Sequence, residues 1–363
     1  MADPAECQAK RPAPPQGAEV QVQQVAPPLV EVEGLARYFD ISPPLLNRLI
    51  ERQERAILKA VDGVSFSIPK GKTFSLVGES GCGKSTVARL LVGLYAPTRG
   101  TIRFDGQDMA AARNRAETKA LRSRLQMIFQ DPYASLNPRW RVQDIIAEPI
   151  RAFQIAGGDE LDEKVGALLT QVGLSPADGH KFPHEFSGGQ RQRISIARAL
   201  AGQPEFLVCD EPTSALDVSV QAQILNLMKD LQRRFGLTYL FISHNLAVVD
   251  HISDEIGVMY LGRLCEVADA RTMFAKPRHP YTRLLLDTIP DLDMTGEARA
   301  PVAGEVPSPI NPPPGCTFHP RCPFANDRCK RERPELKPDP ADGTLVACHA
   351  VEEARLPGRE ISG

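Results

Sequence analysis

The sequence lacks the features of a membrane-spanning or secreted chain. Its 363 residues contain no run of about 18 consecutive apolar residues, so we expect no helix that crosses a bilayer. The N-terminus shows no pattern of positive charge followed by an apolar stretch, as a signal peptide would. We therefore expect a cytoplasmic protein.

The sequence also lacks a surplus of charge and any evident internal repeat. Its net charge of −2 offers no overall attraction to nucleic acid or to an anionic membrane. A hydrophobic content of 42% is enough for a sizeable core. The length predicts one large α/β domain with appendages.

The two ends of the chain have little capacity to form a core. Residues 1–28 are rich in Pro, Ala and Gln, and we expect a disordered tail. Residues 291–314 form a proline-rich linker before a cysteine-rich extension at 315–363. Order is expected to begin with a strand at 29–32, and residues 45–52 have the spacing of a short amphipathic helix packed on its own domain.

Strands and helices alternate along the rest of the chain. We expect strands at 60–68, 73–77, 101–104, 125–130, 206–209 and 238–242, and helices at 87–92, 189–201 and 218–235. A helical subdomain is expected at about 131–190, because 142–178 carry helical periodicity broken by glycine and proline. This alternation predicts a mostly parallel sheet with helices on both faces.

The stretch from Gly78 to Thr86 matches G-x-x-x-x-G-K-[ST], a phosphate-binding loop, between an expected strand and an expected helix. Glycines allow successive N–H groups and the helix N-terminus to point at a polyphosphate. Lys84 is expected to reach the β- and γ-phosphates, and Ser85 to bind Mg²⁺. The alternative is a chance glycine-rich turn. The candidate nucleotide contacts are Gly78, Ser80, Gly81, Cys82, Gly83, Lys84, Ser85 and Thr86.

Two acids follow the apolar strand at 206–209. A carboxylate at the end of a buried parallel strand lies beside the phosphate loop, so Asp210 is expected to hold Mg²⁺. Glu211 is expected to polarise the water that attacks the γ-phosphate. Taken alone, the pair would be interpreted first as two solvated acids that end a strand, and only the phosphate loop nearby makes this the lesser alternative.

A second anion-binding segment is expected at Ser187–Gln190. Ser187 can cap the following helix, while Gly188 and Gly189 expose backbone N–H groups at its N-terminus. One nucleotide does not need two such segments from one chain. We therefore expect a dimer, in which this segment closes on the nucleotide held by the partner.

The order and spacing of these motifs, with Gln130, Ser214–Asp217 and His244, resemble those of ATP-binding cassette (ABC) ATPases over residues 29–290. The resemblance implies a mostly parallel core sheet, an antiparallel β subdomain and a helical subdomain. It also implies a head-to-tail dimer with two ATP molecules at the interface. Asn245 follows His244 where Asp is commoner in the family.

The resemblance further assigns roles to individual residues. Phe39, rather than Tyr38, would stack on the adenine, and His244 would contact the γ-phosphate. Gln130 would contact Mg²⁺ and the attacking water and would sense a membrane subunit. Ser187, Gly188, Gly189 and Gln190 would serve the partner's ATP, and Asp217 would couple the two sites.

Three further stretches resemble the ATPase subunits of oligopeptide and dipeptide ABC importers: Gln130–Arg139, His279–Leu285 and the cysteine-rich tail. The second of the two non-identical ATPases is the more similar. Importers of nickel or glutathione remain alternatives, as do a soluble ABC ATPase of translation or DNA repair and an exporter ATPase.

The resemblance implies a set of partners and a location. The partners are a second ATPase forming a heterodimer, two transmembrane permeases and, indirectly, an extracytoplasmic peptide-binding protein. Nucleic acid is not an expected partner. The location is the cytoplasmic face of the inner membrane.

The tail contains Cys316, Cys322, Cys329 and Cys348 in a stretch with few core-forming residues. Such a segment needs a staple to fold, and four thiolates can ligate a [4Fe–4S] cluster or a tetrahedral zinc. Relatives with this tail carry an iron–sulfur cluster, so the resemblance favours iron. His319 or His349 could replace a thiolate in a zinc site, and four unligated thiols are the remaining alternative.

Overall fold

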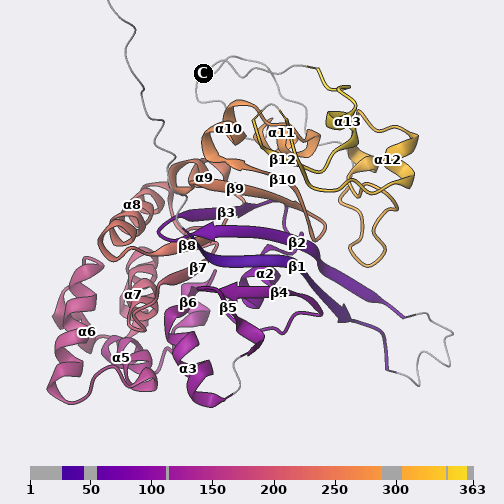
Figure 1. Ribbon diagram of the computed structural model, residues 1–363. Helices are drawn as coiled ribbons and strands as arrows, with labels where there is room; N and C mark the ends of the chain where they lie inside the picture. Colours follow the sequence, from indigo (N-terminus) through magenta and orange to yellow (C-terminus); the bar gives the residue numbers. More distant parts are fainter. Residues whose placement is uncertain (1–26, 45–54, 112–113, 288–304, 341, 358–363) are drawn as a thin grey trace, which may run out of the picture.

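The computed structural model describes residues 27–44, 55–111, 114–287, 305–340 and 342–357, which form two β-sheets with helices between and around them (Figure 1). The first strand begins at Pro28. The predicted tail up to residue 26, the predicted helix at 45–52 and the linker up to residue 304 lie outside the described residues.

The smaller sheet is antiparallel and has the strand order β2-β1-β4-β5. Its strands are β1 (Pro28–Asp40), β2 (Ile57–Pro69), β4 (Arg99–Phe104) and β5 (Gln107–Asp108). In β2, buried Val64, Phe66 and Ile68 alternate with exposed residues, because one face of the sheet covers the core. Asp105 and Gly106 both have positive φ in the turn between β4 and β5, as a two-residue hairpin requires.

The larger sheet has the strand order β11-β12-β10-β9-β3-β8-β7-β6. Its strands are β3 (Thr73–Val77), β6 (Leu125–Ile128), β7 (Phe206–Asp210), β8 (Thr238–Ile242), β9 (Glu255–Tyr260), β10 (Arg263–Asp269), β11 (Lys337–Pro338) and β12 (Leu345–Val346). Strands β9, β3, β8, β7 and β6 are parallel, and β10, β12 and β11 add antiparallel pairs at one edge. The predicted, mostly parallel core is confirmed.

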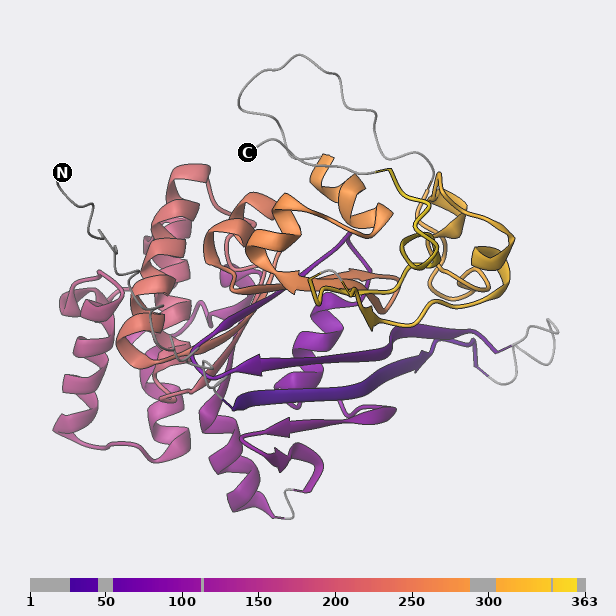
Figure 2. The ribbon, with the colours of Figure 1, turned by 45° about the horizontal axis from the view of Figure 1, so that its top comes forward.

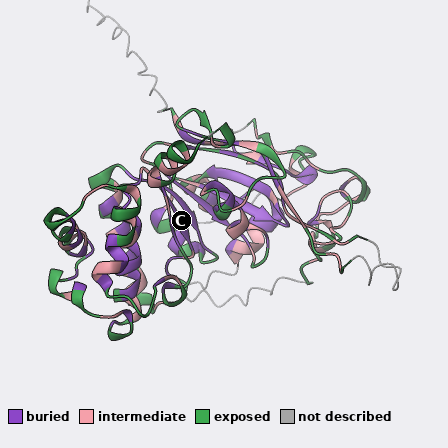
Figure 3. Ribbon diagram, turned by 90° about the horizontal axis from the view of Figure 1, so that it is seen from below, coloured by how far each residue is buried: buried purple, intermediate pink, exposed green. Residues whose placement is uncertain are grey.

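The larger sheet separates two apolar cores. In β7, Phe206 and Val208 belong to the core shared with the smaller sheet, whereas Leu207 and Cys209 belong to the core shared with the helical group. Helix α2 (Lys84–Leu91) lies between the two sheets, in contact with β2, β7 and β8. Every residue of β3, β7 and β8 is buried, as expected for strands covered on both faces (Figure 3).

The other face of the larger sheet packs against a helical group, which Figures 1 and 2 show at one side of the molecule. It consists of α5 (Val142–Phe153), α6 (Asp159–Gln171), α7 (Gly188–Leu200) and α8 (Val218–Phe235). Shorter elements connect these parts: η1 (Met109–Ala111), α3 (Arg115–Arg124), α4 (Pro132–Ser135), η2 (Pro176–His180) and η3 (Pro183–Glu185). Within residues 131–190 the structure has α4, α5, α6, η2, η3 and the first turn of α7, and the division of this region into a separate subdomain stays a prediction.

The C-terminal tail joins the larger sheet. Before the tail, the chain forms α9 (Leu246–Ile252), α10 (Ala270–Ala275) and α11 (Pro280–Asp287). Besides β11 and β12, the tail contains η4 (His319–Arg321), α12 (Asp327–Arg331) and α13 (His349–Glu352). Strand β12 pairs with β10, with Val346 opposite Glu266. Phe318 is buried against Tyr260 and Tyr281, with ring centroids 5.3 Å away in both cases. The tail therefore belongs to the same sheet as β3, the strand that leads into residues 78–86.

Candidate nucleotide-binding site

The phosphate loop connects β3 to α2, as the sequence predicts. Gly78 (φ 150°) and Gly83 (φ 108°) are positions where only glycine fits. A Cβ atom would lie 2.2 Å from the Met259 carbonyl oxygen at Gly78, and 2.1 Å from the Ala60 carbonyl oxygen at Gly83. The close approach of the loop to β2 and β9 fixes its path, and it leaves Ser80 and Gly81 exposed.

Lys84 lies inside this loop and is almost fully buried. Its Nζ donates hydrogen bonds to the carbonyl oxygens of Gly78 (2.7 Å) and Glu79 (3.0 Å). The loop therefore holds a cation at its centre, next to the start of helix α2, where an anion is favoured.

Cys82 contributes its backbone rather than its side chain to this loop. The side chain is buried in the core between the sheets, and burial raises the pKa of its thiol. The sulfur lies 3.7 Å from Lys84 Nζ. The prediction that Cys82 contacts a nucleotide can therefore apply only to its backbone N–H group.

Ser85 and Asp210 form a pair of oxygen donors. The Ser85 Oγ donates a hydrogen bond of 3.0 Å to the Asp210 carboxylate at the end of β7. Asp210 is buried, and this burial raises its pKa. Hydroxyl and carboxylate oxygens are the ligands that Mg²⁺ prefers, and a cation here would stabilise the buried carboxylate, so the pair fits the expected Mg²⁺.

Glu211 lies at the centre of a second polar group. Its carboxylate accepts a hydrogen bond from Gln130 Nε2 (2.9 Å), and its other oxygen lies 3.1 Å from His244 Nδ1. These three residues follow β7, β6 and β8, and the carboxyl ends of parallel strands meet at one edge of a sheet. Glu211 also has a positive φ of 47°, a strained conformation for a residue with a side chain.

Ser187 caps α7, as predicted. Its hydroxyl accepts from the Gln190 N–H (3.3 Å), and the Gln190 side chain accepts from the Ser187 N–H (3.0 Å), forming a capping box. At Gly189, a Cβ atom would lie 2.5 Å from Cγ1 of Val220 in α8. Figures 1 and 2 show α7 in the helical group, whereas α2 lies between the sheets, so the two segments predicted to bind anions are on different parts of the molecule.

Phe39 is partly buried near the end of β1. Its ring makes a T-shaped contact with the ring of Tyr95, with centroids 5.5 Å apart, and the Arg37 guanidinium lies 4.7 Å from the Phe39 centroid. The neighbouring Tyr38 is committed elsewhere, because its hydroxyl is hydrogen-bonded to Asp62. Adenine stacking on Phe39 stays a prediction.

Two features near this site were not predicted from the sequence. Arg321 in the tail makes a two-pronged ion pair with Glu79 of the phosphate loop, across 242 positions of sequence. Arg99 and Arg263 both pair with buried Asp62. Burial opposes ionisation of Asp62, but hydrogen bonds from Tyr38 and Arg263 lower its pKa to about 2. The sequence holds no local signal for either contact.

The four tail cysteines are neighbours in space. Burial and the charges of Cys348, Cys329 and Cys322 raise the pKa of Cys316 to about 12, and burial with Cys322 and Cys329 raises that of Cys348 to about 11. Gly315 (φ 67°) lets Cys316 approach Cys329, because a Cβ atom there would lie 2.4 Å from the Cys329 carbonyl oxygen. Even so, within the described ranges no three His, Cys, Asp or Glu side chains are arranged to hold a metal ion.

Of the two histidines considered as zinc ligands, His349 is engaged on both ring nitrogens, by the Glu332 carbonyl and the Glu352 carboxylate. His319 Nδ1 is bonded to the Cys316 carbonyl oxygen. Four thiols are a donor set that zinc or an iron–sulfur cluster accepts, but among the described residues these side chains are not in a coordinating arrangement.

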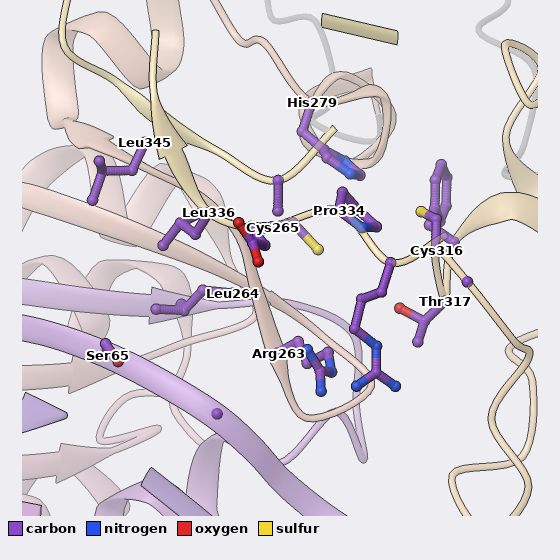
Figure 4. A pocket seen from close by; sticks show the side chains of 16 residues that line it. Ser65, Arg263, Leu264, Cys265, His279, Cys316, Thr317, Pro334, Leu336 and Leu345 are labelled. Carbon is purple, nitrogen blue, oxygen red and sulfur yellow. The ribbon is translucent and has the colours of Figure 1, made fainter. Parts of the chain in front are cut away.

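A cavity of about 560 Å³ lies between β2, β10 and the tail (Figure 4). Arg263, Cys265, His279 and Cys316 are among its lining residues. No residue from 78 to 86 lines it, so it is separate from the nucleotide loop.

Comparison with known proteins places these features in a family. Residues 61–214 match the "ABC transporter" family model, and residues 265–329 match "Oligopeptide/dipeptide transporter, C-terminal region". The oligopeptide transport ATP-binding protein AppF of Bacillus subtilis is 50% identical over 324 residues, covering 88% of this chain and 97% of the relative. The di/tripeptide transport ATP-binding protein DppF of Pseudomonas aeruginosa is 48% identical, covering 90% of this chain and 98% of the relative.

Solved structures show the same fold. CbiO1 from Clostridium perfringens, part of the ABC transporter complex cbiONQ, has a TM-score of 0.57 and 26% identity, covering 68% of this chain and 90% of that one. A dimeric ATP-binding cassette in a post-hydrolysis state with ADP and Pi also has a TM-score of 0.57, at 25% identity, covering 67% and 99%. The chain therefore belongs to the ABC transporter ATPases, in the oligopeptide/dipeptide transporter branch of that family.

Proposed function

We propose that this chain hydrolyses ATP to energise the uptake of di- and oligopeptides by a membrane importer. The observation that carries the proposal is about 50% identity, over nearly the whole length, to proteins named for oligopeptide and di/tripeptide transport. The match of residues 265–329 to the C-terminal region of that branch supports the same cargo class.

The strand-end residues would share the work of hydrolysis. Lys84 would bind the β- and γ-phosphates, and Ser85 with Asp210 would hold the Mg²⁺ that screens their charge. Glu211 would accept a proton from the attacking water as a general base. Gln130 and His244 already contact its carboxylate, so they would keep it oriented toward that water.

A head-to-tail dimer predicts that a substitution in one chain affects nucleotide binding by the other chain. If Ser187–Gln190 serve the partner's nucleotide, Ser187→Arg should lower 8-azido-ATP labelling of the second ATPase in the assembled complex. Labelling of this chain should stay intact, because its own loop at 78–86 is unchanged. Loss of labelling on this chain instead would contradict the arrangement.

The cargo is tested by uptake in cells that express either the wild-type chain or Lys84→Ala at equal levels. We expect the variant to lose uptake of radiolabelled di- and oligopeptides, with nickel and glutathione uptake unchanged. Unchanged peptide uptake would overturn the proposal, and selective loss of nickel or glutathione uptake would identify the alternative importers.

The remaining partners follow from the same proposal. None of the described helices is both long and apolar enough to cross a membrane. We propose that two permease subunits hold the chain at the cytoplasmic face of the inner membrane, that a second, non-identical ATPase completes the dimer, and that an extracytoplasmic binding protein delivers the peptide. Co-purification with ribosomes or DNA, in place of permeases, would indicate a soluble ABC ATPase.

For the tail, we propose that Cys316, Cys322, Cys329 and Cys348 ligate a [4Fe–4S] cluster with a structural role, zinc being the alternative. Binding requires these thiols to lose their protons and to move into a coordinating arrangement. Anaerobically purified protein should contain iron and absorb broadly at about 400 nm. Stoichiometric zinc without iron would replace the cluster, and the absence of both metals would refute a metal site.

A pair of variants tests the structural role of this cluster. Cys322→Ser should lose the iron and reduce folding or assembly more than it reduces ATP hydrolysis by the folded remainder. Cys265→Ala removes a thiol that lines the neighbouring cavity but lies outside the proposed four, so it should retain the iron. Normal assembly of Cys322→Ser would contradict the structural role.

A further inference from the structure

An ion pair connects the phosphate loop to the C-terminal tail. Arg321 donates from Nη1 to Glu79 Oε2 (2.7 Å) and from Nη2 to Glu79 Oε1 (2.9 Å). The Arg321 side chain is 3% exposed and that of Glu79 25%. A two-pronged Arg–carboxylate pair fixes direction as well as distance, so Glu79 has one preferred orientation.

Arg321 is itself held in place by the aromatic residues under the tail. The Tyr260 hydroxyl accepts a third hydrogen bond (3.4 Å), and the guanidinium lies 5.8 and 5.9 Å from the ring centroids of Tyr260 and Phe318. Arg321 directly precedes Cys322, one of the four tail cysteines. The position of the guanidinium therefore depends on the fold of the tail.

A second distant residue fixes the backbone of Glu79. Its N–H donates to the hydroxyl of Tyr281 in α11 (2.9 Å), and its carbonyl oxygen accepts from Lys84 Nζ (3.0 Å). A continuous chain of hydrogen bonds thus leads from Arg321 through Glu79 to Lys84, the residue proposed to bind phosphate.

Charge gives the contact a further consequence. An unpaired carboxylate in this loop would repel a polyphosphate bound a few residues away. Arg321 neutralises that carboxylate where it is only partly exposed to solvent, so water screens the repulsion incompletely. The ion pair removes a negative charge from the field that a nucleotide meets.

We propose that Arg321 is a positioning residue for the nucleotide-binding loop, and that the tail sets ATP affinity through its pair with Glu79. The inference rests on the proposed function in one respect, namely that residues 78–86 bind ATP. Because coupling between two sites is reciprocal, bound ATP also stabilises the tail around Arg321.

The first experiment measures equilibrium binding of Mg·ATP to the full-length chain. Arg321→Gln is expected to weaken binding about 5- to 150-fold, the usual range for coupled sites. Arg321→Gln with Glu79→Gln should recover most of this loss, since the double variant has no unpaired carboxylate. Arg321→Lys keeps the charge without the planar fork and should fall between wild type and Arg321→Gln.

Arg328→Gln is the matched control within the tail. Arg328 pairs with Glu332, Glu352 and Glu353, all in the tail. The variant loosens the tail without touching Glu79, so its ATP affinity should stay close to wild type. An equal loss of affinity in Arg328→Gln, or none in Arg321→Gln, would overturn the inference.

Two further measurements separate positioning from a general loss of structure. Arg321→Gln should raise the KM for ATP and leave kcat nearly unchanged, because Arg321 does not touch the reacting atoms. Mg·ATP should slow hydrogen exchange at residues 316–331 in wild type and not in Arg321→Gln. A fall in kcat with KM unchanged, or equal ATP protection in both proteins, would contradict the proposal.

Lys84→Ala distinguishes this inference from the function on which it rests. If Lys84→Ala retains wild-type ATP affinity, the loop assignment itself is wrong. If Lys84→Ala loses affinity and Arg321→Gln does not, the loop assignment holds and only the role of Arg321 is wrong.

Discussion

The edge of the larger sheet and the cysteine-rich tail differ in whether their polar side chains are already arranged to act together. At the sheet edge, Ser85 is already bonded to Asp210, and Gln130 and His244 already contact Glu211. In the tail, four thiols are neighbours with no coordinating group of three among the described residues. Where parallel strands end at one edge of a sheet, the sheet itself brings their functional side chains together. The short elements of the tail instead depend on packing against other parts of the molecule.

The largest effect is expected from Glu211→Gln, at the edge of the larger sheet. The amide keeps the shape of the side chain but cannot accept a proton, so turnover should fall by about 10²- to 10⁴-fold. ATP binding should persist, and a closed dimer should accumulate. Turnover and ATP binding measured on the same preparation decide this, and near-normal hydrolysis would remove Glu211 from the catalytic role.

The dependence of the tail on the rest of the molecule is tested by Phe318→Ala. Phe318 is 1% exposed, and its removal should lower the free energy of unfolding by about 3–5 kcal/mol. Phe206→Ala in β7 is the control within the sheet core. Because the tail packs on the same body, both variants should lower the midpoint of the main thermal transition. An unchanged main transition in Phe318→Ala would show that the tail unfolds separately.

Because His279 is buried, we expect the free energy of unfolding to depend on pH. Burial lowers its pKa to about 3, from 6.5 in the unfolded chain. The folded state therefore binds the proton less readily, so the stability contribution is complete above pH 6.5 and falls as the pH falls toward 3. At pH 5 the loss should be about 2 kcal/mol relative to neutral pH.

His279→Asn should remove this part of the acid sensitivity, because the amide oxygen can still accept from the Tyr281 N–H and does not titrate in this range. His251→Asn, at an exposed position, is the control and should keep it. Denaturant unfolding at pH 7 and pH 5 measures how much unfolding free energy each variant loses between the two pH values. An equal loss in wild type and His279→Asn would rule out His279 as the cause.

The smallest expected effect comes from Tyr281→Phe, which removes the hydroxyl that accepts the Glu79 N–H. Loss of this hydrogen bond should cost about 1 kcal/mol of stability and weaken ATP binding less than Arg321→Gln does. Tyr239→Phe removes a tyrosine hydroxyl that bonds the Met228 carbonyl, away from the loop. It should show a similar loss of stability with no change in ATP affinity.

The core of the fold was predictable because its signals are local. Apolar runs of strand length gave β7 and β8, and helical periodicity gave α8 at its observed bounds, Val218–Phe235. The glycine pattern of the phosphate loop requires only adjacent residues. The resemblance to ABC ATPases, rather than any local pattern, named Gln130 and His244, and the structure shows both in contact with Glu211.

The contacts that were not predicted join residues far apart in sequence. Glu79 and Arg321 are separated by 242 positions, and Asp62 and Arg263 by 201. Neither arginine lies in a pattern that distinguishes it from a solvated surface charge. Their partners are determined by how β10 and the tail pack, which is a property of the assembled sheet.

The strained backbone at Glu211 has a consequence for the evolution of such sites. A left-handed conformation costs a residue with a side chain about 1–2 kcal/mol, whereas glycine adopts it freely and asparagine with less strain. A Glu211→Gly or Glu211→Asn variant would thus relieve strain while it removed the carboxylate. With Glu211 as the proposed general base, thermostability and turnover would favour different amino acids at this position, so selection for stability alone would lead toward a protein with little ATPase activity.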